Sequence, residues 1–455
     1  MKAGFARRKI TPPLGTRMAG WGARDAARGC ESVHDDLFLR ALYCEHGGEE
    51  LWIVGMDILF LNRPQADRFK GALGRKLDAA PRQILLNCSH THSGPLVGVW
   101  GYAAYFLDTD SRYEDALEVA LLDAAADAKA SAREAVLVAG SGRTRIPLSR
   151  RLLNDAGKAA FRPNPAGEIC DALPVCLFQD RSGTPISLVF SASCHPSTVG
   201  GWAASADYPG AAMAALDDYL KVPGGSLFLQ GAGGDSKLRI IGDGKDAQGQ
   251  ACWRAGTWED SAAAGRQLAQ EVIDVVENGM ARVKPDFVSC LIDLDFPLEP
   301  PATREEYAAQ AAAAGDNEIQ RRWAEMQVEA LDRGDRLPTS ATVALHGLRL
   351  APEVRIVGVE AETVAGIGNR IVSAFAASGR RPSVTFPLGY IDGTRLYLPT
   401  TPMLAEGGYE AESFYEYGYP SSLTPGIEAV LDRGLGELRR AWVGDGDTKK
   451  KEPAA

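Results

Sequence analysis

The sequence predicts an α/β protein with a mixed β-sheet core flanked by helices. Apolar runs rich in β-branched residues alternate with helical patterns along most of the chain. The 455 residues are 45% hydrophobic and 24% charged, a balance that excludes intrinsically disordered and fibrous proteins. We expect one domain over residues 1–442, with no internal sequence repeat, and a disordered tail over residues 443–455.

The expected strands are short apolar runs that end at polar residues or glycine. In chain order they cover residues 51–58, 83–87, 135–140, 186–191, 226–230, 287–294 and 354–359. The expected helices show apolar residues at helical spacing, over residues 112–134, 209–220, 261–277, 304–333, 362–376 and 425–442. Because the two kinds of segment alternate, we expect a largely buried sheet. The Ala- and Glu-rich stretch within 304–333 is typical of a solvated surface helix or helical hairpin.

Charge and composition exclude several functional classes. The net charge of −10 disfavours a general nucleic-acid binder. No apolar stretch reaches the ~20 residues that a bilayer requires, and the charged start, Met1 to Lys9, does not resemble a signal peptide. The eight cysteines are scattered without a Cys-x-x-Cys pair, so we expect a cytoplasmic protein without disulfides or a thiolate metal site.

Three of the six histidines follow predicted strands. His90 and His92 lie in a Ser/Thr/His run after the apolar segment at 83–87, and His195 follows the segment at 186–191. Residues i and i+2 of a strand point to the same face, so His90 and His92 are expected to converge. Each could be a structural histidine bonded to a backbone carbonyl. Because imidazole is the commonest ligand of catalytic zinc, the pattern favours a metal site at the carboxyl ends of strands.

Two common classes of zinc enzyme do not fit this pattern. Metallo-β-lactamases continue the His-x-His pair with Asp-His, whereas Ser93-Gly94 follows here. Barrel amidohydrolases need more histidines and a lysine, and the remaining three histidines are poorly placed for that role.

Several motifs together resemble the neutral (non-lysosomal) ceramidase family. The run His90-Thr91-His92-Ser93-Gly94-Pro95 matches that family's His-Thr-His-Ser-Gly-Pro signature. Further matching motifs follow one another in the expected order: Gly4 to Pro13, Val33 to Leu37, Ser149 to Arg151, Ser205 to Gly210, Gln230 to Asp235, Tyr397 to Thr401 and Glu406 to Glu410. Ordered motifs over most of the chain are more specific than any one of them.

The resemblance implies one Zn²⁺ per chain, held by two histidines, a glutamate and a tyrosine. Carried over motif by motif, these ligands are His90, His195, Glu362 and Tyr397, with Glu360 an alternative to Glu362. Zinc, rather than iron or manganese, rests on the resemblance. It also implies catalytic roles for His92, Tyr409 and Asp235. His92 would act near the metal-bound water, and Tyr409 would donate a hydrogen bond to the substrate carbonyl.

The expected substrate-binding residues come from two segments. Arg150 and Arg151 could orient a polar or anionic part of the substrate, although an exposed pair is an equally good interpretation. In the turn from Gly231 to Gly234, the residues Gly233 and Gly234 could present backbone N–H groups to an oxyanion. Ser236 and Lys237 complete the set.

The sequence departs from the family pattern in two ways. Lys237 stands where the family has an active-site serine, and Ser236 lies one position early. The C-terminal immunoglobulin-like domain of full-length neutral ceramidases is also expected to be absent. Both departures concern ceramide as the substrate rather than the zinc chemistry.

The sequence therefore predicts a zinc hydrolase that cleaves an N-acyl amide, as in ceramide, by attack of a zinc-activated water. The expected partner is a small-molecule or lipid-like substrate. Two alternatives remain open: a zinc hydrolase of an ester, lactone or glycosidic substrate, and a binding protein that kept the fold but lost catalysis.

Overall fold

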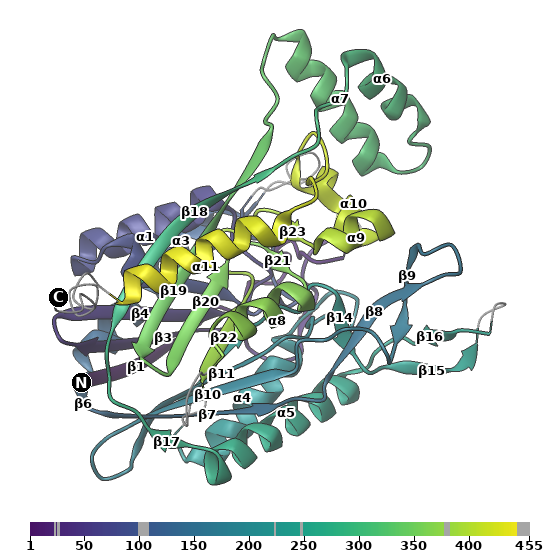
Figure 1. Cartoon of the computed structure of the whole chain (residues 1–455). Helices are drawn as coiled ribbons and strands as arrows, with labels where there is room; N and C mark the ends of the chain where they lie inside the picture. The colour runs from purple at the N-terminus through teal and green to yellow at the C-terminus, as the bar shows by residue number, and fades with distance from the viewer. Residues whose placement is uncertain are drawn as a thin grey trace, which may run out of the picture.

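The computed structural model (Figure 1) describes residues 1–21, 24, 28–98, 109–222, 224–245, 249–376 and 383–443. Its three main sheets repeat one order of elements. Three antiparallel strands are followed by a helix and then by a strand parallel to the third, and a further helix closes each unit. The sequence shows no repeat, so this threefold order is visible only in the topology.

The first unit consists of β1 (Lys2–Lys9), β3 (Phe38–His46), β4 (Glu49–Met56), α1 (Arg63–Leu77), β5 (Ile84–Cys88) and α3 (Ser111–Ala130). β6 (Arg133–Glu134) extends the sheet beside β1, and η1 (Pro81–Gln83) precedes β5. The helix α1 begins where the Asn62 side chain accepts a hydrogen bond from Gln65 N and Pro64 follows, both strong N-terminal signals.

The second and third units repeat this arrangement. The second contains β7 (Val136–Arg143), β10 (Ala172–Gln179), β11 (Pro185–Ala192), α4 (Asp207–Leu220), β13 (Ser226–Gln230) and α5 (Trp258–Asn278), with β17 (Ala281–Arg282) at its edge. The third contains β18 (Val288–Pro297), β19 (Ser340–Ala351), β20 (Val354–Val359), α8 (Ala365–Ala374), β22 (Val384–Leu388) and α11 (Ile427–Val443).

Smaller elements are inserted between these strands. A three-stranded sheet is formed by β8 (Pro147–Leu153), β9 (Ala159–Asn164) and β14 (Ser236–Leu238), beside the hairpin β15 (Ile241–Lys245) and β16 (Ala251–Trp253). Two short parallel pairs join β2 (Ser32–Val33) to β12 (Ala203–Ala204) and β21 (Glu362–Thr363) to β23 (Tyr397–Leu398). The helices α9 (Thr401–Glu406) and α10 (Tyr409–Glu412) and the turn η2 (Ser413–Tyr417) follow β23.

The strands alternate between a common core and a helix-covered face. In β4, Ile53 packs with Val189 of β11 and Ile356 of β20 in the core shared by the three sheets. The neighbouring Val54 packs instead beneath α1 and α3, as the period of two in a strand requires. The other two sheets are covered in the same way, by α4 and α5 and by α8 and α11. Each such buried aliphatic side chain stabilises the fold by about 1.5–3 kcal/mol.

One buried side chain joins the ends of the three parallel edge strands. Asn87 of β5 donates to the carbonyls of Gln230 and Gly389 at 3.3 and 2.9 Å, and its oxygen accepts from Gln230 N at 2.7 Å. Gln230 ends β13, and Gly389 directly follows β22. The loops that leave the three sheets therefore start from one point.

The structure confirms the α/β class, and every predicted strand and helix contains a corresponding element. Residues 304–333 form the helical hairpin alternative, α6 (Arg304–Ala313) and α7 (Glu318–Asp332), which stands out from the body in Figure 1. The helix expected from residue 362 begins at Ala365 instead, because Glu362 and Thr363 pair with β23. The tail predicted at 443–455 lies outside the described residues except for Val443.

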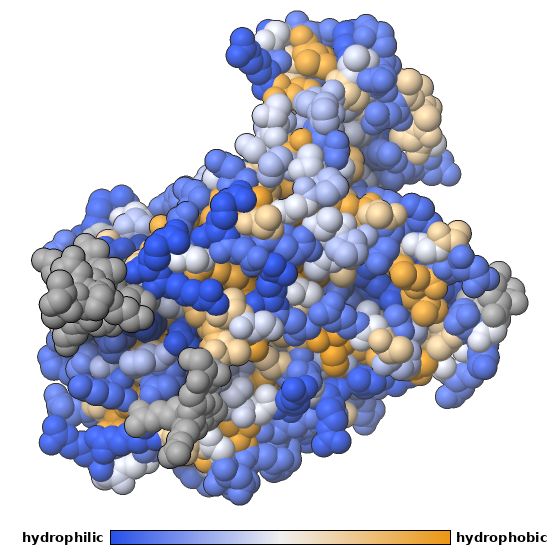
Figure 2. Space-filling model, viewed as in Figure 1, coloured by the Kyte–Doolittle hydropathy of each residue, from blue (hydrophilic) through white to orange (hydrophobic). Residues whose placement is uncertain are grey.

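The surface shows no single large apolar area on the face seen in Figure 2, where hydrophobic residues gather in separate small patches among hydrophilic ones. Among the described residues, no helix combines the length and the hydropathy needed to cross a bilayer.

Candidate metal centre

The three sheets each direct a loop toward one cavity of about 460 Å³. The loop after β5 brings His90 and His92, the loop after β11 brings His195, and the junction between β20 and β21 brings Glu362. Tyr397 of β23 lines the same cavity. Residues far apart in the sequence therefore meet at the carboxyl ends of parallel strand pairs, the usual place for a site in such sheets.

The three histidines present their Nε2 atoms to one another. His90 Nε2 lies 3.0 Å from His195 Nε2 and 3.3 Å from His92 Nε2. One nitrogen of each ring lies within 4.8 Å of the others, a spacing at which the three side chains could hold a metal ion.

Backbone carbonyls fix the tautomers of two of these rings. Nδ1 of His90 donates to the carbonyl of Leu59, and Nδ1 of His195 donates to the carbonyl of Gly233, both at 3.0 Å. In a neutral ring of this tautomer, Nε2 carries a lone pair and no proton, which is the form that binds a metal ion. Burial, followed by the positive charge nearby, holds the pKa of His195 well below its usual range, so this ring is neutral.

Glu362 adds a carboxylate to the same point. Its Oε2 lies 3.2 Å from His90 Nε2 and 3.8 Å from His195 Nε2, and it has no hydrogen-bond donor among the described residues. Burial alone would raise the pKa of Glu362, but His90 and the hydroxyls of Tyr417 and Tyr397 hold it below the usual value. A buried carboxylate thus faces the Nε2 atoms of His90 and His195.

This donor set fits a divalent transition metal. Unprotonated imidazole nitrogens and a carboxylate oxygen are the usual zinc ligands and also suit other ions of the series. A cation at their centre would satisfy the lone pairs that the protein leaves without donors.

The sequence left Glu360 and Glu362 as alternatives, and the structure places them on opposite sides. Glu360 is fully buried, pairs with Arg63 and accepts from Ala344 N. A tight turn between the two carboxylates, closed by Ala361 N donating to the Val359 carbonyl, reverses their directions. Only Glu362 faces the histidines.

The histidines after β5 converge through a turn rather than through strand alternation. β5 ends at Cys88, and His90 has a φ of +64°, a left-handed conformation that costs a non-glycine residue about 1–2 kcal/mol. His90 N donates to the Ile58 carbonyl, and His92 N donates to the Pro196 carbonyl. The convergence was predicted, but the reason given for it was wrong.

Tyr397 and Arg150 form the next layer. The Tyr397 hydroxyl hydrogen-bonds Glu362 and accepts from Arg150 Nη2 at 3.2 Å. Arg150 is buried and pairs with Glu410 at 2.8 Å. Arg150 therefore lines the cavity with its charge already compensated, and the exposed-pair interpretation is wrong.

Arg151 does not line the cavity. It binds Glu410, Glu406 and the carbonyl of Gly407, so it ties β8 to the segment from α9 to α10. Tyr409, by contrast, lines the cavity, and its hydroxyl donates to Glu416 at 2.8 Å. Burial raises the pKa of that glutamate to about 7.

The glycine-rich turn offers no free donors to a substrate. Gly231, Ala232, Gly233 and Gly234 each donate their N–H to a backbone carbonyl at 2.9–3.0 Å. The expected oxyanion-binding role of Gly233 and Gly234 is therefore wrong for the conformation described. Gly233 instead contributes the carbonyl that orients His195.

Asp235 and Ser236 also lie behind the cavity. The Asp235 carboxylate accepts from Ala365 N at the start of α8, and burial raises its pKa to about 7. The Ser236 hydroxyl donates to the Ser193 carbonyl. Neither residue lines the cavity, so both hold the site in place rather than touch a ligand in it.

Lys237, one of the expected substrate-binding residues, lines the cavity. Its ammonium lies 5.6–5.9 Å from the ring centres of Trp21, Phe161 and Trp253. Burial, followed by the nearby Arg150, lowers its pKa to about 8.

Sequence reasoning missed several residues that contact the cluster, among them Tyr417 and Tyr390. Tyr417 donates a hydrogen bond to Glu362 Oε1, and the Tyr390 ring lies tilted by 34° against His90 with centroids 4.2 Å apart. The run of tyrosines and glutamates from Tyr409 to Tyr417 was the only signal for the first. Nothing marked Tyr390.

Two solved structures that are similar to this chain over its whole length are ceramidases. The neutral ceramidase from Pseudomonas aeruginosa matches with a TM-score of 0.71 over 100% of this chain and 75% of that chain, at 18% identity. A ceramidase complexed with C2 matches with a TM-score of 0.71 over 100% of this chain and 76% of that chain, at 17% identity. The chain has the neutral ceramidase fold. No protein-family model and no curated protein sequence matches it, so the neutral ceramidase fold is recognised here through structure and through the motifs around its histidines.

Proposed function

We propose that this protein is a zinc-dependent hydrolase that cleaves an N-acyl, ceramide-like amide. One observation carries the proposal: the Nε2 atoms of three histidines converge with Glu362 Oε2, which has no hydrogen-bond donor among the described residues, in a cavity of a neutral ceramidase fold. Such a cluster has an electrostatic reason to exist only around a cation.

The proposed ligands are His90, His195, Glu362 and Tyr397, with one ion per chain. Bound there, zinc would supply Lewis acidity, lowering the pKa of a water molecule to ~7 and polarising a carbonyl group. The carbonyls of Leu59 and Gly233 hold the two imidazoles in the ligating tautomer. Tyr417 holds the carboxylate.

His92 is the proposed proton carrier. Burial and then the charges of nearby groups hold its pKa well below the usual range, so the ring is neutral and able to accept a proton. Its Nε2 faces the cluster, and its Nδ1 has no partner among the described residues. In this proposal Nε2 takes a proton from the attacking water and returns it to the leaving amine.

Tyr409 and Arg150 are the proposed orienting groups. The Tyr409 hydroxyl is held by Glu416, whose pKa is raised to about 7; when Glu416 is protonated it can donate to the Tyr409 oxygen, and the Tyr409 hydrogen would then be donated to the substrate carbonyl. Arg150 keeps the Tyr397 hydroxyl aimed at Glu362, because it occupies the other side of that oxygen. Leu59, Phe60, Phe161 and Ile319 supply an apolar wall of the cavity for an acyl chain.

We also propose a reducing, cytoplasmic location. All eight cysteines are unpaired, and six of them are buried, as expected of a protein that folds among free thiols.

Chelation tests the proposal. The full-length protein is stripped of metal, the removal is verified by elemental analysis, and hydrolysis is measured on a panel of N-acyl amides, esters, lactones and glycosides. The expected result is amide hydrolysis that disappears on chelation and returns with zinc. Undiminished hydrolysis after verified metal removal would contradict the proposal, activity confined to another substrate class would correct the substrate, and metal binding without any turnover would favour the binding-protein alternative.

A further inference from the structure

Lys237 is a cation without an anion. Among the described residues, its ammonium has no carboxylate within ion-pair distance and no hydrogen-bond acceptor, and its contacts are the three aromatic rings. The other cations nearby are compensated: Arg150 pairs with Glu410, and Arg254 pairs with Asp260. Aromatic faces attract a cation but do not neutralise it.

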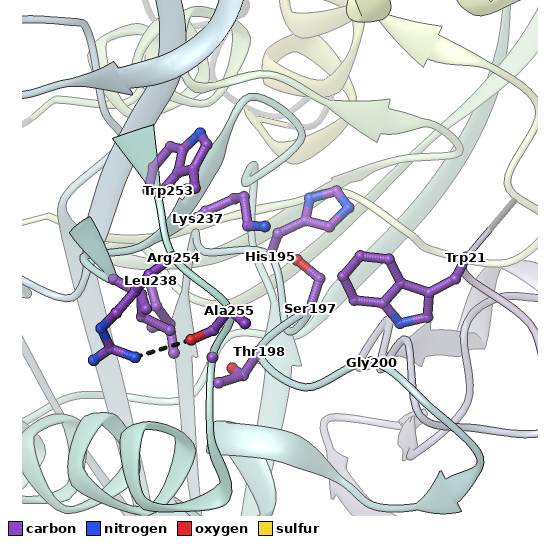
Figure 3. Close-up of a pocket in the computed structure, with 12 residues that line it drawn as sticks. Trp21, His195, Ser197, Thr198, Gly200, Lys237, Leu238, Trp253, Arg254 and Ala255 are labelled. Atoms are coloured by element: carbon purple, nitrogen blue, oxygen red, sulfur yellow. Dashed lines mark hydrogen bonds between the residues drawn. The ribbon is translucent and has the colours of Figure 1, made fainter. Parts of the chain in front are cut away.

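The lysine stands between two hollows. The metal-site cavity adjoins a second hollow of about 310 Å³, and Trp21, His195, Ser197 and Lys237 line both. Figure 3 shows this second hollow, with the Lys237 amine pointing toward the side where His195 and Ser197 lie. The backbone of Lys237 also bridges that of His195, so the lysine is anchored beside a proposed metal ligand.

The wall of the second hollow carries hydrogen-bond donors. Lys237 and Arg254 line it, and no aspartate or glutamate of the described part of the chain does. The indole N–H groups of Trp21 and Trp253, which also line it, are buried without acceptors. This hollow is therefore electropositive, while Leu59, Phe60 and Ile319 give one wall of the metal-site cavity an apolar surface.

We propose that the substrate is an N-acyl amine whose amine portion carries a carboxylate, bound by Lys237 in the second hollow. The inference rests on the proposed amidase function. The acyl chain occupies the apolar lobe, the amide lies at the histidine cluster, and the carboxylate pairs with the ammonium. A single lysine suits a monoanion, whereas a phosphate dianion is usually met by several donors.

Two hydrolysis-resistant probes test the proposal on the full-length protein. They are N-dodecanoylglycine and its primary amide, each with the scissile nitrogen replaced by methylene, so that they differ only in charge. Binding is measured by calorimetry and by fluorescence of Trp21 and Trp253, which flank Lys237. We expect the carboxylate probe to bind about tenfold or more tightly than the amide, because a charge-assisted hydrogen bond discriminates by this much.

The variants assign that preference to one side chain. Lys237→Gln should abolish it, and Lys237→Arg should retain most of it. Lys76→Gln, which removes the same charge from an exposed ion pair with Asp123, should leave it unchanged. Circular dichroism verifies that each variant folds.

Equal binding of the two probes by the wild type, no binding of either, or a preference that survives Lys237→Gln would overturn the inference. These outcomes are separable from failure of the amidase proposal. Hydrolysis of neutral N-acyl amides without a carboxylate preference would remove only the inference. A Lys237-dependent preference without any turnover would remove only the amidase function.

Discussion

His90 and His195 each donate a hydrogen bond from Nδ1 to a backbone carbonyl, and this hydrogen bond determines the role of Nε2. A neutral ring that donates through Nδ1 must accept through Nε2. His92 is different, because its Nδ1 has no partner among the described residues. The three histidines of this cavity thus differ in the hydrogen bonding of Nδ1. This difference distinguishes the proposed ligands, His90 and His195, from the proposed proton carrier, His92.

Replacing His92 with alanine tests this separation. Since general acid–base catalysis contributes about 10²–10⁴-fold, His92→Ala should lower kcat by that factor while the metal content per chain stays unchanged. Steady-state kinetics and elemental analysis of the same preparation measure both. Loss of the metal together with activity would instead make His92 a ligand.

Tyr417 tests the support of the carboxylate. Its hydroxyl donates to Glu362 Oε1, and removal of such a partner typically costs about 10–100-fold in metal affinity. Tyr417→Phe should therefore weaken zinc binding by this factor, as measured by competition with a chelator. Tyr219→Phe removes a hydroxyl that contacts Glu277 on the surface and serves as the control. Identical affinities in the two variants would exclude the proposed role of Tyr417.

At the scale of elements, a buried charge cluster joins the first unit to the third. Asp392, in the turn after β22, contacts Lys70 of α1 at 2.6 Å and His346 of β19 at 3.2 Å. Leu86 N of β5 donates to its other oxygen. The cluster holds the turn that follows Gly389, where the three sheets meet.

This cluster predicts how stability depends on pH. Burial alone would raise the pKa of Asp392, but Lys70 and His346 lower it from 3.8 to about 2. A depressed folded-state pKa stabilises the protein above the unfolded value, and this stabilisation is lost as the pH falls from 3.8 toward 2. The free energy of unfolding, measured in urea at several pH values, should decline over that interval.

Asp392→Asn should remove this decline and leave Lys70 buried without its counterion. Breaking a buried pair in this way costs about 3–5 kcal/mol, so we expect that loss in urea unfolding at pH 7. Asp123→Asn breaks the exposed pair with Lys76 and should cost less than about 1 kcal/mol. Equal effects would show that the cluster does not support the fold.

At the scale of the whole molecule, the proposed ligands come from all three units. His90 belongs to the first, His195 to the second, and Glu362 and Tyr397 to the third. An ion that binds only the folded chain stabilises it by mass action, by about 4 kcal/mol at a free concentration of 1,000 times Kd. We therefore expect zinc to raise Tm and a chelator to lower it in calorimetry. A Tm that is independent of zinc would argue against a site shared by the units.

The sequence predicted the elements better than their arrangement. Runs such as residues 51–58 and 186–191 are apolar because both faces of those strands are buried, and such runs are readable without a partner. The threefold order was not readable, because it is carried by strand pairing rather than by similar residues.

The site was predictable to the extent that residue type decides it. The three histidines could be identified from the sequence, but the roles of the neighbouring residues depend on local backbone geometry. The turn at Ala361 separates Glu362 from Glu360, and the hydrogen bonds of Gly233 and Gly234 remove their donors. Neither the turn nor these hydrogen bonds can be predicted from the amino-acid sequence.

The most direct test of the account is the metal content of the purified full-length protein, compared with that of a folded His195→Ala variant. Elemental analysis should find about one divalent transition-metal ion per wild-type chain and almost none in the variant. An active wild-type protein without bound metal, or equal metal content in the two proteins, would contradict the claim that these histidines and Glu362 exist to hold a cation.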